Sequence, residues 1–351
     1  MTAPETARPL RVLILADEKP GHYHQSEGVV RALSRVTSVA SRRVIVERRA
    51  WAPRILLRTM HRRNASAQAI LSTGYGLGPA DLEAPDIVVS SGGETVFATI
   101  AAAQLTGARS IYLGTIGDDL SAEFDLVIAS QAGADAPGNH ARLLQPNAID
   151  PDQFSSILRS GPAGGRTAAV LIGGNTRHIR YSVSDWEALA GFMQVMHRET
   201  GLRFVVATSR RTRPDVIAAL SPVVHDRAVT RQFLDYRMAG PSALPPALAV
   251  SSLAFVTADS SAMLSEAIAA RLPTIAISGS DHWLDAGETR YREFLSAQGW
   301  TRSLAMAGLA PQTCAEALRQ ITPRSDNHLD ELANMLRVRF ATLLRPHTGT
   351  N

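Results

Sequence analysis

The sequence of 351 residues contains one cysteine, Cys314, and one lysine, Lys19. A single cysteine excludes a disulfide framework, a cysteine-based zinc site and an iron–sulfur cluster, and it agrees with a reducing cytosol. No uncharged apolar run reaches the roughly 18 residues of a membrane-spanning helix. The polar segment before residue 10 lacks the pattern of a secretory signal. We therefore expect a soluble protein of the cytoplasm.

Basic residues outnumber acidic residues only slightly, since the formal net charge is +4. That value is too small to indicate a nucleic-acid partner, and we expect none. Hydrophobic residues make up 45% and charged residues 19%, which is typical of a globular protein and not of a disordered one. At about 150 residues a domain, the length suggests two domains.

The basic residues are concentrated in one stretch. Ten arginines and one acid, Glu47, lie between Arg31 and Arg63. At the end of this stretch, in residues 48–63, arginines alternate with apolar residues and with Trp51. A basic amphipathic segment of this kind can lie on an anionic membrane. A surface helix whose apolar side faces the core explains the same pattern, so both interpretations stay open.

The chain repeats a pattern of strand, turn and helix. Leu10–Ala16 is apolar at every position except Arg11, a pattern typical of a strand buried on both faces. Alternating strands and helices predict βαβ units and mostly parallel sheets. The other predicted strands are 43–47, 86–90, 110–115, 126–129, 168–172, 203–208, 254–257 and 274–278. The predicted helices are about 25–36, one ending near 106, 184–200, one ending near 270 and 328–344.

A glycine-rich stretch, 161–165, lacks periodicity and is interpreted as a linker. The pattern of strands and helices starts again after it. The predicted fold class is therefore α/β, with two Rossmann-like doubly wound domains that face a cleft.

In parallel sheets of this kind, ligands bind at the carboxyl ends of the strands. The turn after the first strand carries Asp17, Lys19, Gly21, His22 and Gln25. The imidazoles of His22 and of His24, in the same turn, could act as general bases, because the ordinary pKa of a histidine is near neutrality. The turn lacks both the dinucleotide fingerprint and the P-loop pattern. A simple tight turn with solvated histidines is the alternative.

A second strand-end turn contains Ser91, Gly92 and Gly93. Its two glycines would allow the backbone to approach a ligand closely, or would only allow a tight turn into the next helix.

The second half has three such turns. Gly173, Gly174 and Asn175 form the first, and Ser209, Arg210 and Arg211 form the next. Two guanidinium groups at a strand end suit a diphosphate. The third turn contains Thr257, Asp259, Ser260 and Ser261 and precedes a predicted helix with Glu266. Hydroxyls and free amides at a helix N-terminus suit phosphate, and the glutamate suits ribose hydroxyls. An N-cap serine followed by an ordinary surface glutamate explains the same residues.

Two resemblances follow from these motifs. Residues 259–274 resemble the donor-binding segment of GT-B glycosyltransferases of the MurG kind. The motifs Lys-Pro-Gly-His-x-x-Gln at 19–25, Gly-Gly-Asn at 173–175, Thr-Ser-Arg-Arg-Thr at 208–212 and Thr-x-Asp-Ser at 257–260 resemble the mitochondrial fission ELM1-like family. Bacterial members of that family look like sugar-nucleotide-dependent glycosyltransferases, whereas plant members are associated with recruiting a dynamin-related protein. Relatives usually carry a His-Asp pair after the strand that matches 126–129, but this sequence has Ser-Gln-Ala-Gly at 130–133.

The resemblance implies a role for each domain. Residues 1–160 would take the acceptor, residues 161–326 would bind the nucleotide sugar, and residues 327–351 would form a helix and tail that pack back on the first domain. Glu266 would hold the ribose, while Ser260, Ser261 and the amides of Gly173 and Gly174 would face the diphosphate. Either Arg210 or Arg211 would offset charge on the leaving group. His22, with Lys19 and Asp17 beside it, would deprotonate an acceptor hydroxyl or position the diphosphate.

We therefore expect a glycosyltransferase that uses a nucleotide sugar as co-substrate, with no further cofactor and no bound metal, because enzymes of the fold that the resemblance implies do not usually need a metal. The acceptor would be an envelope glycolipid or polysaccharide. Residues 48–63 would help to dock a lipid-linked acceptor at the inner face of the cytoplasmic membrane. Two alternatives remain: a non-catalytic adaptor of the same fold that recruits a partner protein, and a sugar-nucleotide epimerase.

Overall fold

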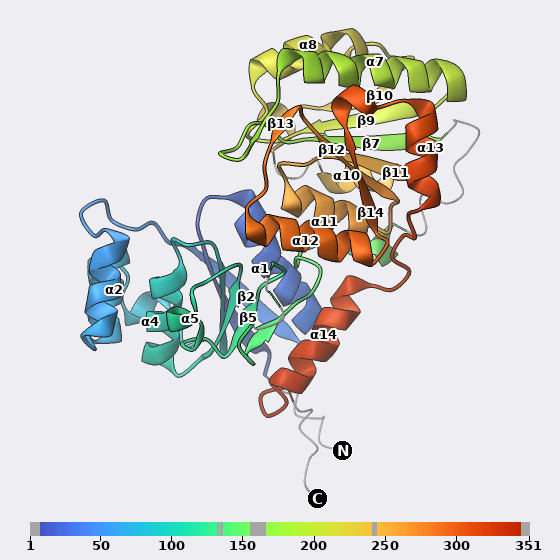
Figure 1. The fold of residues 1–351 in the computed structure, drawn as a ribbon. Coiled ribbons are helices and arrows are strands. Elements are labelled where there is room, and N and C mark those ends of the chain that lie inside the picture. Colours follow the sequence, from blue (N-terminus) through green and yellow to red (C-terminus); the bar gives the residue numbers. More distant parts are fainter. Residues whose placement is uncertain (1–7, 132, 134–135, 155–165, 241–243, 345–351) are drawn as a thin grey trace, which may run out of the picture. The chain divides into compact units, whose positions relative to one another are not determined.

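The computed structural model describes residues 8–131, 133, 136–154, 166–240 and 244–344 (Figure 1). The chain forms two compact units. Unit 1 consists of the residues up to Ala148 together with those from His328 onward, and unit 2 consists of Ile149–Asn327. The division falls before the predicted boundary at residue 160, and the predicted linker at 161–165 lies outside the described residues. Among the helices that the structure describes, none has both the length and the apolar character needed to cross a membrane.

Unit 1 contains a parallel sheet with the strand order β2-β1-β3-β4-β5-β6. The first strand occupies the predicted residues, Leu10–Ala16, and is buried at every position except Arg11. The second strand lies at Val39–Ile45, four residues before its predicted start, because this edge strand is mostly exposed and gives little apolar signal. The remaining strands are β3 (Ile87–Ser91), β4 (Arg109–Leu113), β5 (Leu126–Ile128) and β6 (His140–Ala141).

Helices cover both faces of this sheet. Successive residues of β1 point to opposite sides, so Val12 joins one apolar cluster and Leu13 joins the other. The first cluster includes α1 and α14, and the second includes α2, α3 and α4. The C-terminal helix α14 thus packs in unit 1, beside α1. The helices are α1 (Pro20–Leu33), α2 (Arg54–Arg62), α3 (Ala67–Tyr75), η1 (Pro79–Asp81), α4 (Val96–Thr106), α5 (Asp118–Ser121) and α14 (His328–Arg339).

Helix α1 begins earlier than the sequence pattern predicted. Lys19 is its extended N-cap residue and Pro20 occupies the first helical position. Proline is favoured there because its fixed φ suits the helix and its missing N–H is not needed. His22 therefore lies in the first turn of a helix, and the interpretation of Pro20–Gly21 as a simple tight turn is wrong.

Unit 2 contains a second parallel sheet with the order β10-β9-β7-β11-β12-β14. Numbered within the unit, this is the 3-2-1-4-5-6 order of the Rossmann fold. The strands are β7 (Thr167–Ile172), β9 (Arg203–Thr208), β10 (Thr230–Leu234), β11 (Leu253–Thr257), β12 (Thr274–Ser278) and β14 (Thr301–Ala305). A separate antiparallel pair joins β8 (Ile179–Arg180) to β13 (Asp281–His282).

One apolar cluster packs α7, α8 and α13 on one face of this sheet, while α10 and α11 contact it from the other face (Figure 1). The helices of unit 2 are η2 (Pro151–Gln153), α7 (Val183–Thr200), α8 (Pro214–Val224), α9 (Tyr236–Ala239), α10 (Leu244–Ala249), α11 (Ser261–Ala269), α12 (Ala286–Ala297), η4 (Met306–Gly308) and α13 (Pro311–Arg319).

Each sheet has a point where the chain reverses the direction in which it adds strands. In unit 1 that point lies between β1 and β3, and in unit 2 it lies between β7 and β11. Ligands of doubly wound folds bind outside the carboxyl ends of the strands at such switch points. The turns that begin at Asp17 and Gly92 flank the first point, and those at Gly173 and Ala258 flank the second.

Candidate functional site

A carboxylate and an imidazole meet at the switch point of unit 1. Asp17 follows β1 directly, and its Oδ2 lies 2.7 Å from Nδ1 of His22. Its Oδ1 accepts a hydrogen bond of 3.1 Å from the backbone N–H of Lys19, whose Nζ lies 3.9 Å from Oδ2. The structure therefore brings together the three residues that the sequence assigned to catalysis.

The glycine turn after β3 makes room for this pair. Gly92 has φ +92°, a backbone conformation that other residues rarely adopt. A Cβ at this position would lie 2.3 Å from Nδ1 of His22 and 3.1 Å from Oδ2 of Asp17. Thr95 fixes the turn, since its Oγ1 donates to the carbonyl of Gly92 at 2.9 Å. The glycine is thus required by the close approach of His22.

The carboxylate of Asp17 is charged at neutral pH. Burial alone would raise its pKa, but the hydrogen bond and charge of His22, with smaller contributions from Lys19, outweigh burial and lower the pKa. A charged carboxylate favours the tautomer in which Nδ1 of His22 carries the proton. Nε2 then has a free lone pair, and the partly exposed ring can accept a proton from a hydroxyl.

Other residues near this pair were not predicted as members of a site. Arg54, at the start of α2, is the nearest group to the position that a Cβ on Gly93 would take. Tyr112 on β4 is buried, and burial raises its pKa to about 12, with an opposing effect from Arg54 and a reinforcing one from Asp17. The basic segment thus contributes a guanidinium to this edge of the sheet, which a local sequence pattern does not show.

The remaining candidates in unit 1 serve the local structure. Gln25 is buried, and its amide donates to the carbonyl of Gly21 at 2.9 Å. Ser91 is also buried, and its carbonyl accepts from Thr95 at 3.3 Å. His24 packs edge-on against Tyr23.

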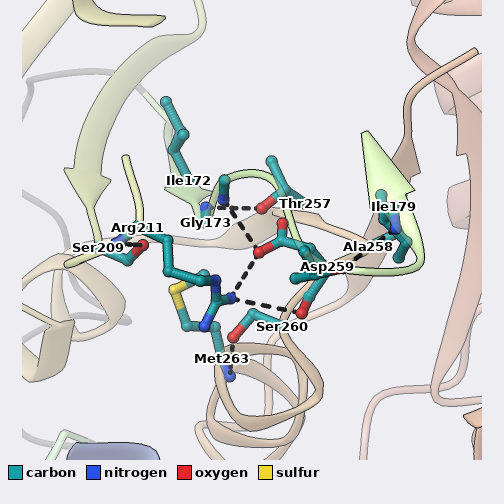
Figure 2. A network of polar contacts seen from close by, with 12 residues as sticks. Ile172, Gly173, Ile179, Ser209, Arg211, Thr257, Ala258, Asp259, Ser260 and Met263 are labelled. Atoms are coloured by element: carbon teal, nitrogen blue, oxygen red, sulfur yellow. Dashed lines mark hydrogen bonds and ion pairs between the residues drawn. The ribbon is translucent and has the colours of Figure 1, made fainter. Parts of the chain in front are cut away.

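At the switch point of unit 2, a buried carboxylate joins three segments of chain (Figure 2). The side chain of Asp259 is 0% exposed. Its Oδ2 accepts hydrogen bonds from the N–H of Gly174 at 3.0 Å and from Nη2 of Arg211 at 2.5 Å. Its Oδ1 accepts from the hydroxyl of Tyr181 at 3.2 Å. Burial and the nearby Asp259 raise the pKa of that phenol, so it stays a donor.

The two glycines after β7 are required because their backbone lies close to other parts of the chain: Gly173 to the carboxylate of Asp259, and Gly174 to the loop after β9. A Cβ on Gly173 would lie 2.0 Å from Oδ2 of Asp259, and a Cβ on Gly174 would lie 2.3 Å from the carbonyl oxygen of Arg211. The N–H of Gly173 donates to Oγ1 of Thr257 at 2.7 Å. In this structure, side chains of the protein therefore occupy both amides that the sequence assigned to a diphosphate.

The two arginines after β9 differ in their surroundings. Arg211 is tied to Asp259 and its side chain is 40% exposed. Arg210 is exposed and forms no ion pair with any described residue. Oγ of Ser209 accepts from the N–H of Arg211 at 3.2 Å, and Oδ1 of Asn175 accepts from the N–H of Tyr181 at 2.9 Å.

Helix α11 begins at the same edge of the sheet. Oγ of Ser260 accepts from the N–H of Met263 at 3.3 Å and so caps the helix. Oγ of Ser261 donates to Oε2 of Glu288 at 2.6 Å. Glu266, in the second turn, is buried, so the interpretation of it as an ordinary surface glutamate is wrong. Across the described ranges, no group of three or more histidine, cysteine or acidic side chains has the geometry to hold a metal.

Comparison with known proteins identifies the family. Residues 20–338 match the family model described as mitochondrial fission ELM1. The chain belongs to this family. The match confirms the resemblance that the motifs indicated, and no curated protein matches the sequence significantly.

Solved structures of the same fold include two types of enzyme. A putative UDP-N-acetylglucosamine 2-epimerase from Listeria monocytogenes has a TM-score of 0.61 at 11% identity, over 95% of this chain and 97% of that chain. MnaA from S. aureus, in a structure with UDP, has a TM-score of 0.58 at 11% identity, with coverage of 95% and 97%. The glycosyltransferase SnogD from Streptomyces nogalater has a TM-score of 0.51 at 16% identity, with coverage of 95% for both chains. These similarities confirm the predicted fold class of two Rossmann-like domains.

Proposed function

We propose that this member of the family is a glycosyltransferase that moves a sugar from a nucleotide-sugar donor to an acceptor hydroxyl. The observation that carries the proposal is the pair of Asp17 and His22, a charged carboxylate that orients an imidazole with one free nitrogen. A general base is needed to activate an acceptor hydroxyl. A non-catalytic adaptor has no use for such a pair.

Unit 2 would hold the donor. Its Rossmann strand order supports a nucleotide at this switch point, and the structure of MnaA with UDP supports a nucleotide as ligand of this fold. Glu266 would bind the ribose hydroxyls. The N-terminus of α11 and one of the two arginines after β9, Arg210 or Arg211, would offset the negative charge that develops on the diphosphate, without a bound metal.

In the proposed reaction, the acceptor oxygen attacks the anomeric carbon of the donor sugar. As the new C–O bond forms, the bond from that carbon to the diphosphate oxygen breaks, and its electron pair leaves with the nucleoside diphosphate. Nε2 of His22 accepts the proton of the acceptor hydroxyl. Asp17 stabilises the resulting imidazolium through the 2.7 Å contact at Nδ1.

We further propose that the acceptor is an envelope glycolipid or polysaccharide precursor carried on a lipid, reached at the inner face of the cytoplasmic membrane. Trp51, just before α2, is 61% exposed, and Ile55, in the first turn of α2, is 73% exposed; arginines flank both residues in the sequence. Exposed apolar side chains among arginines suit an anionic lipid surface. Trp51→Ala with Ile55→Ala should reduce sedimentation with anionic vesicles, whereas Val338→Ala, an exposed apolar residue on α14, should not. Equal sedimentation of both variants would contradict membrane contact through α2.

The first experiment on the donor site is a thermal-shift panel of nucleoside diphosphates and nucleotide sugars with the wild type and Glu266→Ala. A ligand at a hundred times its Kd stabilises a protein by about 2.7 kcal/mol. We expect one nucleotide to raise the Tm of the wild type and to lose this effect in Glu266→Ala. If none of them raises the Tm, the adaptor function is favoured, and a search for a partner protein follows.

A sugar-nucleotide epimerase is the second candidate. The TM-scores to MnaA and to the Listeria 2-epimerase exceed the TM-score to SnogD. An epimerase would convert the donor with no acceptor present. Incubation of the protein with the donor alone, followed by NMR of the sugar, separates the two activities, because only an epimerase yields an intact nucleotide sugar of changed configuration.

A further inference from the structure

The buried carboxylate of Asp259 lies where the proposed donor would place its diphosphate. A nucleoside diphosphate is an anion, yet Asp259 places a negative group among the amides and the arginine that would receive it. The side chain of Asp259 is 0% exposed, so a ligand cannot touch it while the network is intact. It can therefore act on a ligand either by repulsion through space or through the groups that it holds.

The group through which it can act is Arg211. Nη2 of Arg211 donates to Oδ2 of Asp259 at 2.5 Å and to the backbone oxygen of Asp259 at 3.4 Å. The guanidinium is planar and its five N–H donors have fixed directions. Two contacts at one corner therefore fix the orientation of the whole group. The other donors, on Nη1 and Nε, have no partner among the described residues, and the side chain is 40% exposed.

The carboxylate itself is held firmly. Besides Arg211, the N–H of Gly174 and the hydroxyl of Tyr181 donate to it, and the same hydroxyl lies 3.3 Å from the N–H of Asp259. The carboxylate also lies close to Gly173, where a Cβ would be 2.0 Å from Oδ2 (Figure 2). An anchor of this rigidity gives Arg211 one orientation before any ligand arrives, which reduces the entropy lost on binding.

We propose that Asp259 is a positioning residue that holds one corner of Arg211, so that the free edge of this guanidinium binds the diphosphate of the donor. The proposal rests on the proposed function. It assigns the phosphate contact to Arg211 rather than to Arg210, which carries the same charge but has no anchor in the described part of the chain. It also removes Asp259 from the residues that touch the substrate.

A double-mutant cycle tests this role. Binding of UDP, GDP, ADP, CDP and dTDP to the full-length protein is measured by isothermal titration, and the diphosphate that binds best is used for the variants. Arg211→Ala should weaken it by about tenfold or more, as expected for a charge-assisted bond to phosphate. Asp259→Asn should weaken it by about threefold to tenfold. In the Arg211→Ala background, Asp259→Asn should have no further effect, because residues that act through one contact are not additive.

Two further variants keep the test independent of folding. Tyr181→Phe is nearly isosteric and removes one donor to the carboxylate. It should weaken binding moderately in the wild type and not at all in Arg211→Ala. Arg210→Ala is the matched control for charge and should change the affinity by less than about threefold, as a surface charge does.

Three results would overturn the proposal. If Asp259→Asn tightens binding, the carboxylate acts by repelling the diphosphate. If the effects of Asp259→Asn and Arg211→Ala multiply, Asp259 does not act through Arg211. If Arg210→Ala costs as much as Arg211→Ala, the anchored guanidinium has no special role. In all three cases the wild type still binds a diphosphate, so the proposed function stands, whereas absence of binding to the wild type removes both proposals.

Discussion

Nδ1 of His22 lies 2.7 Å from Oδ2 of Asp17, and its ring occupies space that a side chain at residue 92 would fill. The two partners follow β1, whereas the glycine follows β3. A contact between neighbouring strand ends therefore sets the position of the proposed base. This makes the glycine turn, as well as the pair itself, a target for experiment.

Replacing Gly92 by alanine should displace His22 from Asp17, and should therefore cost more stability than the strain of the backbone alone. Gly107 is the matched control, because it also has a positive φ of +71° but no atom within 4 Å of its would-be Cβ. We expect Gly107→Ala to lower the free energy of unfolding by about 1–2 kcal/mol, the cost of a left-handed residue with a side chain. Gly92→Ala should lower it further and reduce donor turnover, measured by urea denaturation and nucleotide release. Equal losses in both variants would contradict the close contact with His22.

The lowered pKa of Asp17 should affect stability in acid. Because the folded state binds this proton less readily than the unfolded chain, the stabilisation is complete above the unfolded pKa of about 3.9 and is lost as the pH falls through the folded pKa. The wild type should therefore lose more stability than Asp17→Asn between about pH 5 and pH 3. Urea midpoints across this range test the difference. His22→Asn removes the main cause of the lowered pKa, so it should show the same flatter profile. A steep profile in His22→Asn would assign the effect to another residue.

Helix α14 should contribute to the stability of unit 1. Leu336 is fully buried in the apolar cluster that contains α1 and alternate residues of the sheet. Leu336→Ala should lower the free energy of unfolding by about 2–5 kcal/mol through lost burial and a residual cavity. Val338 lies two residues further on the same helix and is exposed. Val338→Ala should change stability by no more than about 0.5 kcal/mol. Similar urea midpoints for the two variants would show that α14 does not pack in this core.

The single thiol should be inert in the folded protein. Cys314 lies in the apolar cluster of unit 2, and burial raises its pKa to about 11. Since the thiolate is the reactive form, about one molecule in a thousand would carry it at about pH 8, even without the steric protection. A thiol reagent should label the protein only at the rate at which it unfolds, and at once in concentrated urea. Rapid labelling of the native protein would contradict the burial of this side chain.

Much of the fold could be predicted because central strands carry a strong signal. Leu10–Ala16 and Arg203–Thr208 are buried except at Arg11 and in part at Arg203, and each contains an unbroken apolar run, at 12–16 and 204–207. The edge strands β10 and β14 were not predicted, since their half-exposed, mixed sequences look like loops. The strand at Val39–Ile45 was misplaced for the same reason.

The turns of the site were predictable, but their internal contacts were not. Because ligand sites of parallel sheets lie at strand ends, the sequence indicated the loops that the structure places at the two switch points. Whether a glycine amide there is free depends on residues far along the chain. Gly174 and Asp259 are 85 residues apart and still share a hydrogen bond. No local pattern reveals such a pair, and the same holds for Arg54 beside the turn of Gly93.

Unit 2 is an insertion in unit 1, since the chain leaves unit 1 at Ala148 and returns at His328. During synthesis on a ribosome, every residue of unit 2 emerges before α14 does. Unit 2 can therefore complete its core while the nascent unit 1 still exposes the apolar face of α1 that α14 covers. Because domains fold as units during translation, the apolar face of α1 stays exposed until α14 is made, and chaperones would bind the growing chain there.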